Sequence, residues 1–120
     1  MTGKELFKIA VNLLGYGDSD RTRQTALDAL NGVYAEIFYT ENGRNAKFTP
    51  LDSMNDELNL SQFAKTNCAV YGLCAALALS ENDADSQGYY ASIYNARLSR
   101  LPLKSQTRAN AVSFPEGGSI

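Results

Sequence analysis

The most restrictive feature of this sequence is an apolar stretch over residues 68–79, which reads CAVYGLCAALAL and contains neither a charge nor an amide. The acidic turn SENDADSQ follows it, and a segment with three tyrosines comes next. A helix that is apolar on all sides must be surrounded by protein. A chain of 120 residues forms one domain. We therefore expect this helix at the centre of a bundle or against another subunit.

The apolar stretch is shorter than the roughly 20 residues that cross a bilayer. The N-terminal segment MTGKELFKIAVNLLGYG is interrupted by lysines and lacks the long apolar run of a secretory signal. Hydrophobic residues make up 44% of the chain and charged residues 20%, which is typical of a soluble globular protein. We expect a soluble protein without membrane contact.

Four helices are predicted, and the first two occupy the N-terminal third. The first begins at Thr2, whose hydroxyl can cap it while Glu5 reaches back, and ends at Gly15. Its apolar stripe is Leu6, Ile9, Ala10, Leu13 and Leu14. The second ends near Tyr39 and has three candidate caps, Asp18, Ser19 and Asp20. Its stripe is Ala26, Leu27, Leu30, Tyr34, Ile37 and Phe38.

The third helix contains the apolar stretch and runs to about Ser80, with Ser61, or Asn59 with Gln62, as its cap. Small residues along it let neighbouring helices approach closely, namely Ala69, Gly72, Ala75, Ala76 and Ala78. Larger side chains are expected to fill the remaining gaps, namely Phe63, Val70, Leu73, Leu77 and Leu79.

The fourth helix follows a cap at Asp83 or Asp85, and Pro102 ends it. Its broad stripe consists of Tyr89, Tyr90, Ile93, Tyr94, Arg97, Leu98 and Leu101. The predicted fold class is all-α, a four-helix bundle over residues 1–101 with an extended C-terminal arm over residues 102–120.

Residues 41–60 form a connection that is unusually long for a bundle, in which two to eight residues are common. The pair Asn42 and Gly43 between two extended segments favours a short β-hairpin, because both residues tolerate positive φ. Pro50 holds Thr49 extended. We expect this connection to have a function of its own.

Catalytic chemistry is not expected. Histidine, the commonest general base and metal ligand, is absent. Cys68 and Cys74 lie six residues apart, which fits no common zinc pattern, and we interpret both as small core residues in a reducing compartment. The paired carboxylates fall in turns and helix caps. We therefore predict that the protein is not an enzyme and has no cofactor and no metal site.

The C-terminal part is basic, although the formal net charge of the whole chain is −2. No Asp or Glu lies between Ser86 and Pro115. A solvated face is the preferred interpretation of this basic segment, and a track for DNA or other phosphates is the alternative. The tyrosines of the fourth helix are interpreted as packing residues rather than as platforms for bases. The cations that could contact phosphate are Arg97, Arg100, Lys104 and Arg108.

Three consecutive segments together carry a family resemblance: FTPLDSMNDELNL, then FAKTNCAVYGLCAALALSEND, then YYASIYNARLSRL. Their order and texture resemble the small head-to-tail connector proteins of tailed bacteriophages, also called adaptor or head-completion proteins. The likeness covers residues 48–101 and rests on helix order, because the family has no invariant catalytic motif.

The resemblance implies a structural virion protein, assembled in the host cytoplasm. It implies a homo-oligomeric ring of about twelve copies that lies beneath the portal protein, extends the channel for DNA and docks tail or neck proteins. DNA would pass without sequence specificity. The connection and the arm would then supply the contacts between subunits and with the portal, through Asn42, Gly43, Arg44, Phe48, Leu51, Val112 and Phe114.

Two other functions remain open from the residues alone. One is a small nucleic-acid-binding regulator that uses the basic arm. The other is an adaptor that binds a single protein partner beside the third helix.

Overall fold

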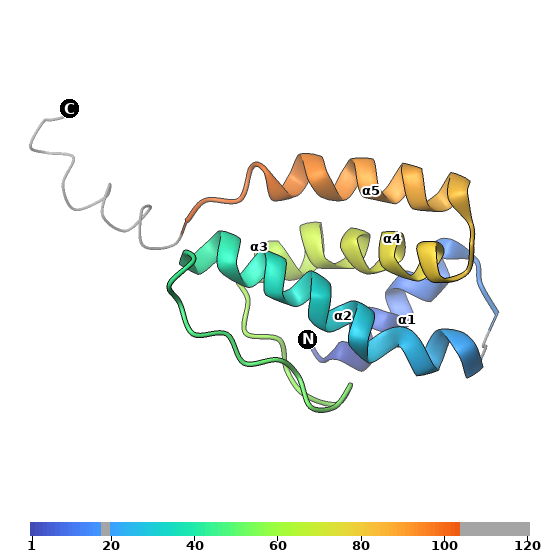
Figure 1. Cartoon of the computed structure of the whole chain (residues 1–120), viewed down its shortest axis with the longest axis horizontal. Helices are drawn as coiled ribbons and strands as arrows, with labels where there is room; N and C mark the ends of the chain where they lie inside the picture. Colours follow the sequence, from blue (N-terminus) through green and yellow to red (C-terminus); the bar gives the residue numbers. More distant parts are fainter. Residues whose placement is uncertain (18–19, 104–120) are drawn as a thin grey trace, which may run out of the picture.

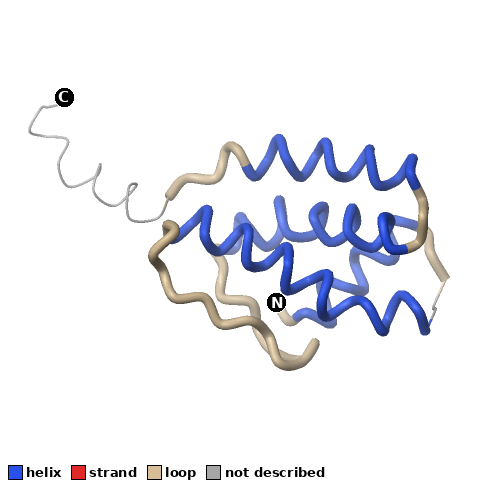
Figure 2. The backbone as a smooth tube through the Cα atoms, viewed as in Figure 1, coloured by secondary structure: helices blue, strands red, loops and turns tan. Residues whose placement is uncertain are grey.

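The computed structural model describes residues 1–17 and 20–103 and is all-α. Helices make up nearly all of its regular structure (Figure 2). In the described part there is no β-strand, only an isolated antiparallel bridge between Thr2 and Glu57. The elements are α1 (Gly3–Leu14), α2 (Asp20–Asn42), α3 (Gln62–Ala64), a π-helical turn (Lys65–Ala69), α4 (Val70–Ser80) and α5 (Ala84–Leu98).

Helix α4 occupies the centre of the molecule, with α5 on one side and α1 and α2 on the other (Figure 1). Leu73, Cys74 and Leu77 have no exposed surface. The central position predicted for the apolar stretch is therefore correct, and neighbouring helices of the same chain provide most of its cover. Leu79, at the C-terminal end of the stretch, is the exception and is 67% exposed.

Three predicted helix starts are confirmed by their hydrogen bonds. Thr2 and Glu5 form the capping box at α1, with the Thr2 hydroxyl accepting from the Glu5 amide at 3.2 Å. The Ser61 hydroxyl accepts from the Ala64 amide at 3.1 Å, and the Asp83 carboxylate accepts from the Ser86 amide at 3.2 Å. Each bond satisfies a backbone donor that has no partner inside its helix. Of the three cap candidates for α2, Asp20 is its first residue and residues 18–19 lie outside the described part.

The predicted hairpin at Asn42 and Gly43 is wrong. Helix α2 continues past Tyr39, and Asn42 is its last residue. The Asn42 side-chain amide donates to the carbonyl of Phe38 at 2.9 Å, and Gly43 follows with φ of 92°. The same dipeptide that permits a tight hairpin also ends a helix, because a glycine after the last turn can adopt positive φ without strain.

The predicted apolar stripes are only partly correct. In α1, Leu6 and Ala10 are fully buried, whereas Ile9 and Leu13 are 39% and 46% exposed. Phe63 and Leu79, predicted to fill gaps, are instead exposed, and so is Tyr89 of the predicted stripe of the fourth helix. Each helix contacts its neighbours over only part of its circumference, so residues at the edge of a broad apolar stripe remain in water.

Helix α4 and its neighbours are close at Gly72, as the small-residue pattern predicts. A Cβ atom on Gly72 would lie 2.6 Å from Val33 Cγ1 and 2.7 Å from Tyr94 Cε1. These two atoms come from α2 and α5, which lie on different sides of α4. Gly72 therefore allows both helices to approach the central one at the same level.

Between α3 and α4 the chain forms a π-helical turn that the sequence pattern does not reveal. Lys65–Ala69 adopts it, and the Asn67 side-chain amide donates to the Phe63 carbonyl at 3.2 Å within this segment. The wider turn changes the rotational phase of the helix between Ala64 and Val70. Both of these residues are buried, so the turn keeps the apolar side aligned with the core across the junction.

The combined helical segment Gln62–Ser80 is long and apolar enough, by length and composition, to cross a membrane, with a mean hydropathy of 1.2 over its most apolar window. In the fold, 56% of that window is buried inside the protein. A core helix of a soluble protein meets the same criterion, so this property by itself does not assign a location.

Candidate interaction site

The long connection between α2 and α3, residues 43–61 in the structure, is tied to α2 by three polar side chains. Asn31 accepts from the Leu51 amide at 2.8 Å and donates to the Leu51 carbonyl at 3.0 Å. The Tyr34 hydroxyl accepts from the Asn59 amide at 2.8 Å. Glu41, which is 2% exposed, accepts from both the amide and the hydroxyl of Ser61. The connection is therefore held at its middle and at its end.

The connection also covers the start of α1. The amides of Gly3 and Lys4 donate to the carbonyls of Asp56 and Met54 at 3.2 and 2.7 Å. The Leu58 amide donates to the Met1 carbonyl at 3.2 Å. Carbonyl groups of the connection thus satisfy donors that the first turn of a helix leaves without partners. The long segment completes the fold as well as linking two helices.

Aromatic rings anchor the first half of the connection. The ring of Phe48 lies 5.0 Å from that of Tyr34, 5.4 Å from that of Phe38 and 5.8 Å from that of Tyr39, measured between centroids. All three partners belong to α2. Edge-on and tilted contacts of this kind add to the free energy gained by burying the rings.

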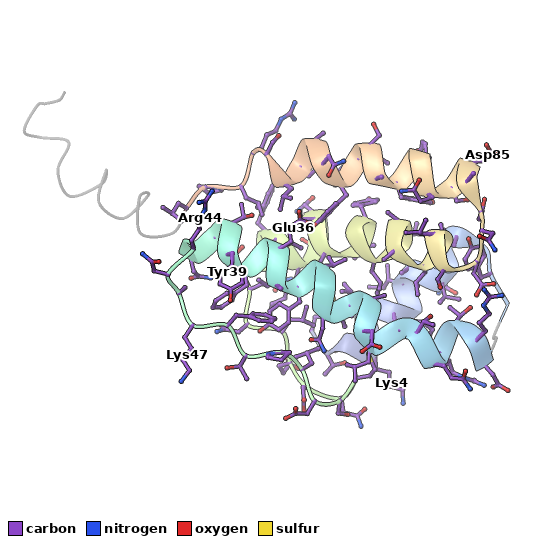
Figure 3. The ribbon with its side chains drawn as sticks, in the orientation of Figure 1. Lys4, Glu36, Tyr39, Arg44, Lys47 and Asp85 are labelled. Carbon is purple, nitrogen blue, oxygen red and sulfur yellow. The ribbon has the colours of Figure 1, made fainter. Side chains whose placement is uncertain are left out.

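The structure places the predicted interface residues in two groups. Asn42 ends α2, Gly43 follows it, and Arg44 beside them is exposed (Figure 3). Leu51 belongs to the chain's own core and is 7% exposed, whereas Phe48 is partly buried and packs against that core. Val112 and Phe114 lie outside the described residues. The exposed residues of the connection are instead polar or small, namely Arg44, Asn45, Lys47, Thr49, Pro50, Asp52, Asn55, Asp56, Glu57 and Asn59.

Of the predicted phosphate-contacting cations, Arg97 is engaged within the chain. Its guanidinium lies 4.7 Å above the Tyr71 ring and donates to the Asn67 carbonyl at 3.2 Å. Such a cation–π contact and hydrogen bond hold the side chain against the fold. Arg100 is exposed. Lys104 and Arg108 lie outside the described residues. The structure therefore describes only two of the four predicted cations, Arg97 and Arg100.

The tyrosines predicted to pack in the fourth helix have different environments. Tyr94 is 7% exposed and its hydroxyl donates to Glu36, and burial together with this bond raises the pKa of Tyr94. Tyr90 stacks on Tyr71 with ring centroids 6.2 Å apart. Tyr89 is 63% exposed. Packing therefore accounts for Tyr94 and Tyr90 but not for Tyr89.

The two cysteines are free and buried, as predicted for small core residues. Burial raises the pKa of Cys68 to about 11 and that of Cys74 to about 12. The thiolate is the nucleophilic form, so at neutral pH both side chains remain protonated and poorly reactive. Neither thiol has the properties of a catalytic nucleophile.

A second group of hydrogen-bonded polar side chains joins the α4–α5 turn to Tyr16 and to the start of α2. The Tyr16 hydroxyl donates to Asp83 at 2.8 Å, and the Thr22 hydroxyl donates to Glu81 at 3.0 Å. Hydrogen bonds from Ser86 and Tyr16 hold the pKa of Asp83 below its ordinary value. These hydrogen bonds hold the α4–α5 turn against the start of α2, and this structural role accounts for the cluster.

Comparisons of this chain with protein-family models, curated proteins and solved structures find no match. Among residues 1–17 and 20–103, no three side chains of His, Cys, Asp or Glu come together closely enough to hold a metal ion. The candidate interaction site is therefore defined by geometry, as the exposed side of a connection that hydrogen bonds hold to α1 and α2.

Sequence reasoning missed the residues that hold the connection, and one signal could have found them. Glu41 lies four residues after Ile37 and seven after Tyr34, so it continues the apolar stripe of α2. A carboxylate on a buried face requires hydrogen-bond donors, since its desolvation is otherwise costly. Extending α2 by three residues would have turned Glu41 from a loop residue into a buried anchor.

We expect Glu41→Gln to lower the free energy of unfolding by about 1–3 kcal/mol, because the bonds from Ser61 lose their charged acceptor. Hydrogen exchange at the Ser61 amide should become faster. The matched control is Glu57→Gln, a largely exposed carboxylate on the same connection that should cost less than about 1 kcal/mol. Equal effects of the two substitutions would contradict the anchoring role of Glu41.

Proposed function

We propose that this protein is a non-enzymatic structural subunit of a bacteriophage virion, a head-to-tail connector. In this proposal the helices form a four-helix bundle, and copies of the chain associate into a ring beneath the portal protein. The ring extends the DNA channel and docks tail or neck proteins. The proposal rests on the resemblance of residues 48–101 to that class of protein, and the all-α fold is consistent with it.

One structural observation supports the proposal most directly. The connection between α2 and α3 is anchored through Asn31, Tyr34 and Glu41, yet its outer side is exposed and polar. An ordered surface loop on a rigid support is a typical place for binding residues. A segment that is ordered before assembly loses little conformational entropy when a neighbouring subunit binds to it. Arg44 and Lys47 are its exposed cations.

The test is to mix the purified chain with the portal protein encoded in the same genome and to measure the mass of the product. A ring of this chain on the portal is the expected result. The double substitution Arg44→Glu with Lys47→Glu should weaken assembly, whereas Lys65→Glu, which changes a charge at the π-helical turn, should not. A chain that binds no portal ring under any condition would end the proposal.

A nucleic-acid-binding regulator is the competing function, and exposed Tyr89 and Arg100 are the observations that favour it. It predicts an affinity for DNA that falls steeply with salt, because each phosphate contact releases counterions. Deletion of residues 103–120 separates the possibilities. Ring assembly suffers if the connector proposal holds, DNA affinity suffers if the regulator holds, and an adaptor for a single protein partner is unaffected.

A further inference from the structure

The outer surface along α1 is hollowed, and α2 borders part of this hollow. One hollow of about 260 Å³ lies among Lys4, Phe7, Arg23, Ala26 and Met54. A second of about 490 Å³ continues from Lys4 and Phe7 towards Val11 and Tyr16. Because the two share residues on α1, they form one groove, here called the α1–α2 groove. Its floor is mainly apolar.

The groove follows from how α1 is placed. Leu6 and Ala10 face the core and are fully buried. At Gly3 the helix lies so close to α2 that an added Cβ would be 2.8 Å from Leu30 Cδ2. Phe7 and Val11, on the next face of α1, are only partly covered. This face is therefore left open along about two turns of helix, roughly 10 Å at 1.5 Å per residue.

The charges on the groove have one sign. Lys4, Lys8 and Arg23 line it, and among residues 1–17 and 20–103 no carboxylate does. Arg23 forms an ion pair with Asp20. Neither Lys4 nor Lys8 has an ion pair within the described part of the chain. The two lysines are four residues apart on a helix, an arrangement that costs a few tenths of a kcal/mol.

We propose that the α1–α2 groove binds an acidic amphipathic helix of a partner protein, about two turns long. Apolar side chains of that helix contact Phe7 and Val11, and carboxylates on its flanks pair with Lys4 and Lys8. This is the helix-in-groove mode of recognition, in which apolar side chains give affinity and flanking charges give orientation and specificity. The inference does not depend on the connector proposal.

Charge argues against the chain's own C-terminal segment as the occupant. Residues 104–120 contain Lys104 and Arg108 against a single carboxylate side chain, Glu116. A segment with a single carboxylate side chain cannot pair with both lysines, and its own cations are repelled by those of the groove. A partner helix rich in Glu or Asp carries the opposite charge and is attracted to these cations.

The experiment uses two fluorescent 16-residue helical peptides with the same leucine stripe and either Glu or Lys at the flanking positions. Fluorescence anisotropy against the full chain should show the Glu peptide binding at least tenfold more tightly than the Lys peptide. Since the whole chain carries a net charge of −2, general electrostatic attraction would favour the Lys peptide instead. A preference for the Glu peptide therefore reports the local charge of the groove.

Substitutions at the two lysines of α1 test whether the peptide binds in the groove. Lys4→Glu with Lys8→Glu should reverse the preference, and circular dichroism should show an unchanged fold because both side chains are exposed. Lys65→Glu is the control, since Lys65 belongs to the π-helical turn and lines neither hollow, and it is compared with each single substitution, Lys4→Glu and Lys8→Glu. The proposal is overturned if the Glu peptide does not bind, if Lys65→Glu has the same effect as the single groove substitutions, or if a single-stranded oligonucleotide displaces the peptide.

Discussion

Truncation of Leu73 to alanine is expected to lower the free energy of unfolding by about 3–5 kcal/mol, measured by urea denaturation. Leu73 has no exposed surface and lies on α4, which contacts α1, α2 and α5. The loss combines the transfer free energy of the removed carbon atoms with the cost of the cavity that remains. Because three helices pack on α4, we expect the cavity to persist rather than to be filled by a shift of one neighbour.

The matched control for this prediction is Leu79→Ala, which makes the same chemical change on the same helix. Leu79 is 67% exposed, so the expected change is within about 0.5 kcal/mol. Similar losses for the two substitutions would mean that α4 is not central in solution. Loss of stability at Leu79 alone would place the buried side of the helix on the opposite face.

Replacement of Gly72 by leucine is expected to destabilise the fold by about 3 kcal/mol, or to prevent folding. The new Cβ would lie 2.6 Å from Val33 Cγ1 and 2.7 Å from Tyr94 Cε1. Val33 is β-branched with little rotamer freedom, and Tyr94 is held through its bond to Glu36. Neither neighbour can move aside, so α2 or α5 must separate from α4.

Gly32→Leu provides the control for Gly72, because a Cβ at Gly32 on α2 meets no atom within 4 Å. Leucine has a higher helix propensity than glycine, so this variant should be more stable by up to about 1 kcal/mol. The two glycines should thus give changes of opposite sign in the same denaturation experiment. A Gly72→Leu protein as stable as the wild type would show that α2, α4 and α5 do not meet at that level.

The helix ends were predictable because their signals are local. Thr2 with Glu5, Ser61 and Asp83 each bind a backbone amide three residues away, so neighbours in sequence suffice to define them. The central position of α4 was predictable for a different reason. A segment without polar side chains has no face to present to water.

The connection after α2 was not predictable in the same way. Asn42 and Gly43 are compatible with both a hairpin and a helix end, and local sequence does not choose between them. The choice depends on Glu41, whose carboxylate binds Ser61 twenty residues further along the chain. Continuation of α2 to Asn42 places that carboxylate where it meets its donors.

The candidate surfaces could not be predicted from the sequence either. Arg97 and Arg100 are neighbours in a basic segment, but only the fold shows that Tyr71 and Asn67 hold Arg97. Lys4, Phe7, Lys8 and Val11 share one face of a helix, which their spacing implies. That this face remains partly open beside α2 depends on where Gly3 contacts Leu30.

By itself the sequence determined the helical class, the helix starts and the identity of the core segment, because propensity, capping and apolar periodicity act over a few residues. Only the tertiary structure decided which side of each apolar stripe is covered, how the long connection is held and where an open groove remains. These outcomes depend on contacts between residues far apart in the chain. The free energy of such contacts is fixed by the geometry of packing, which no local pattern specifies.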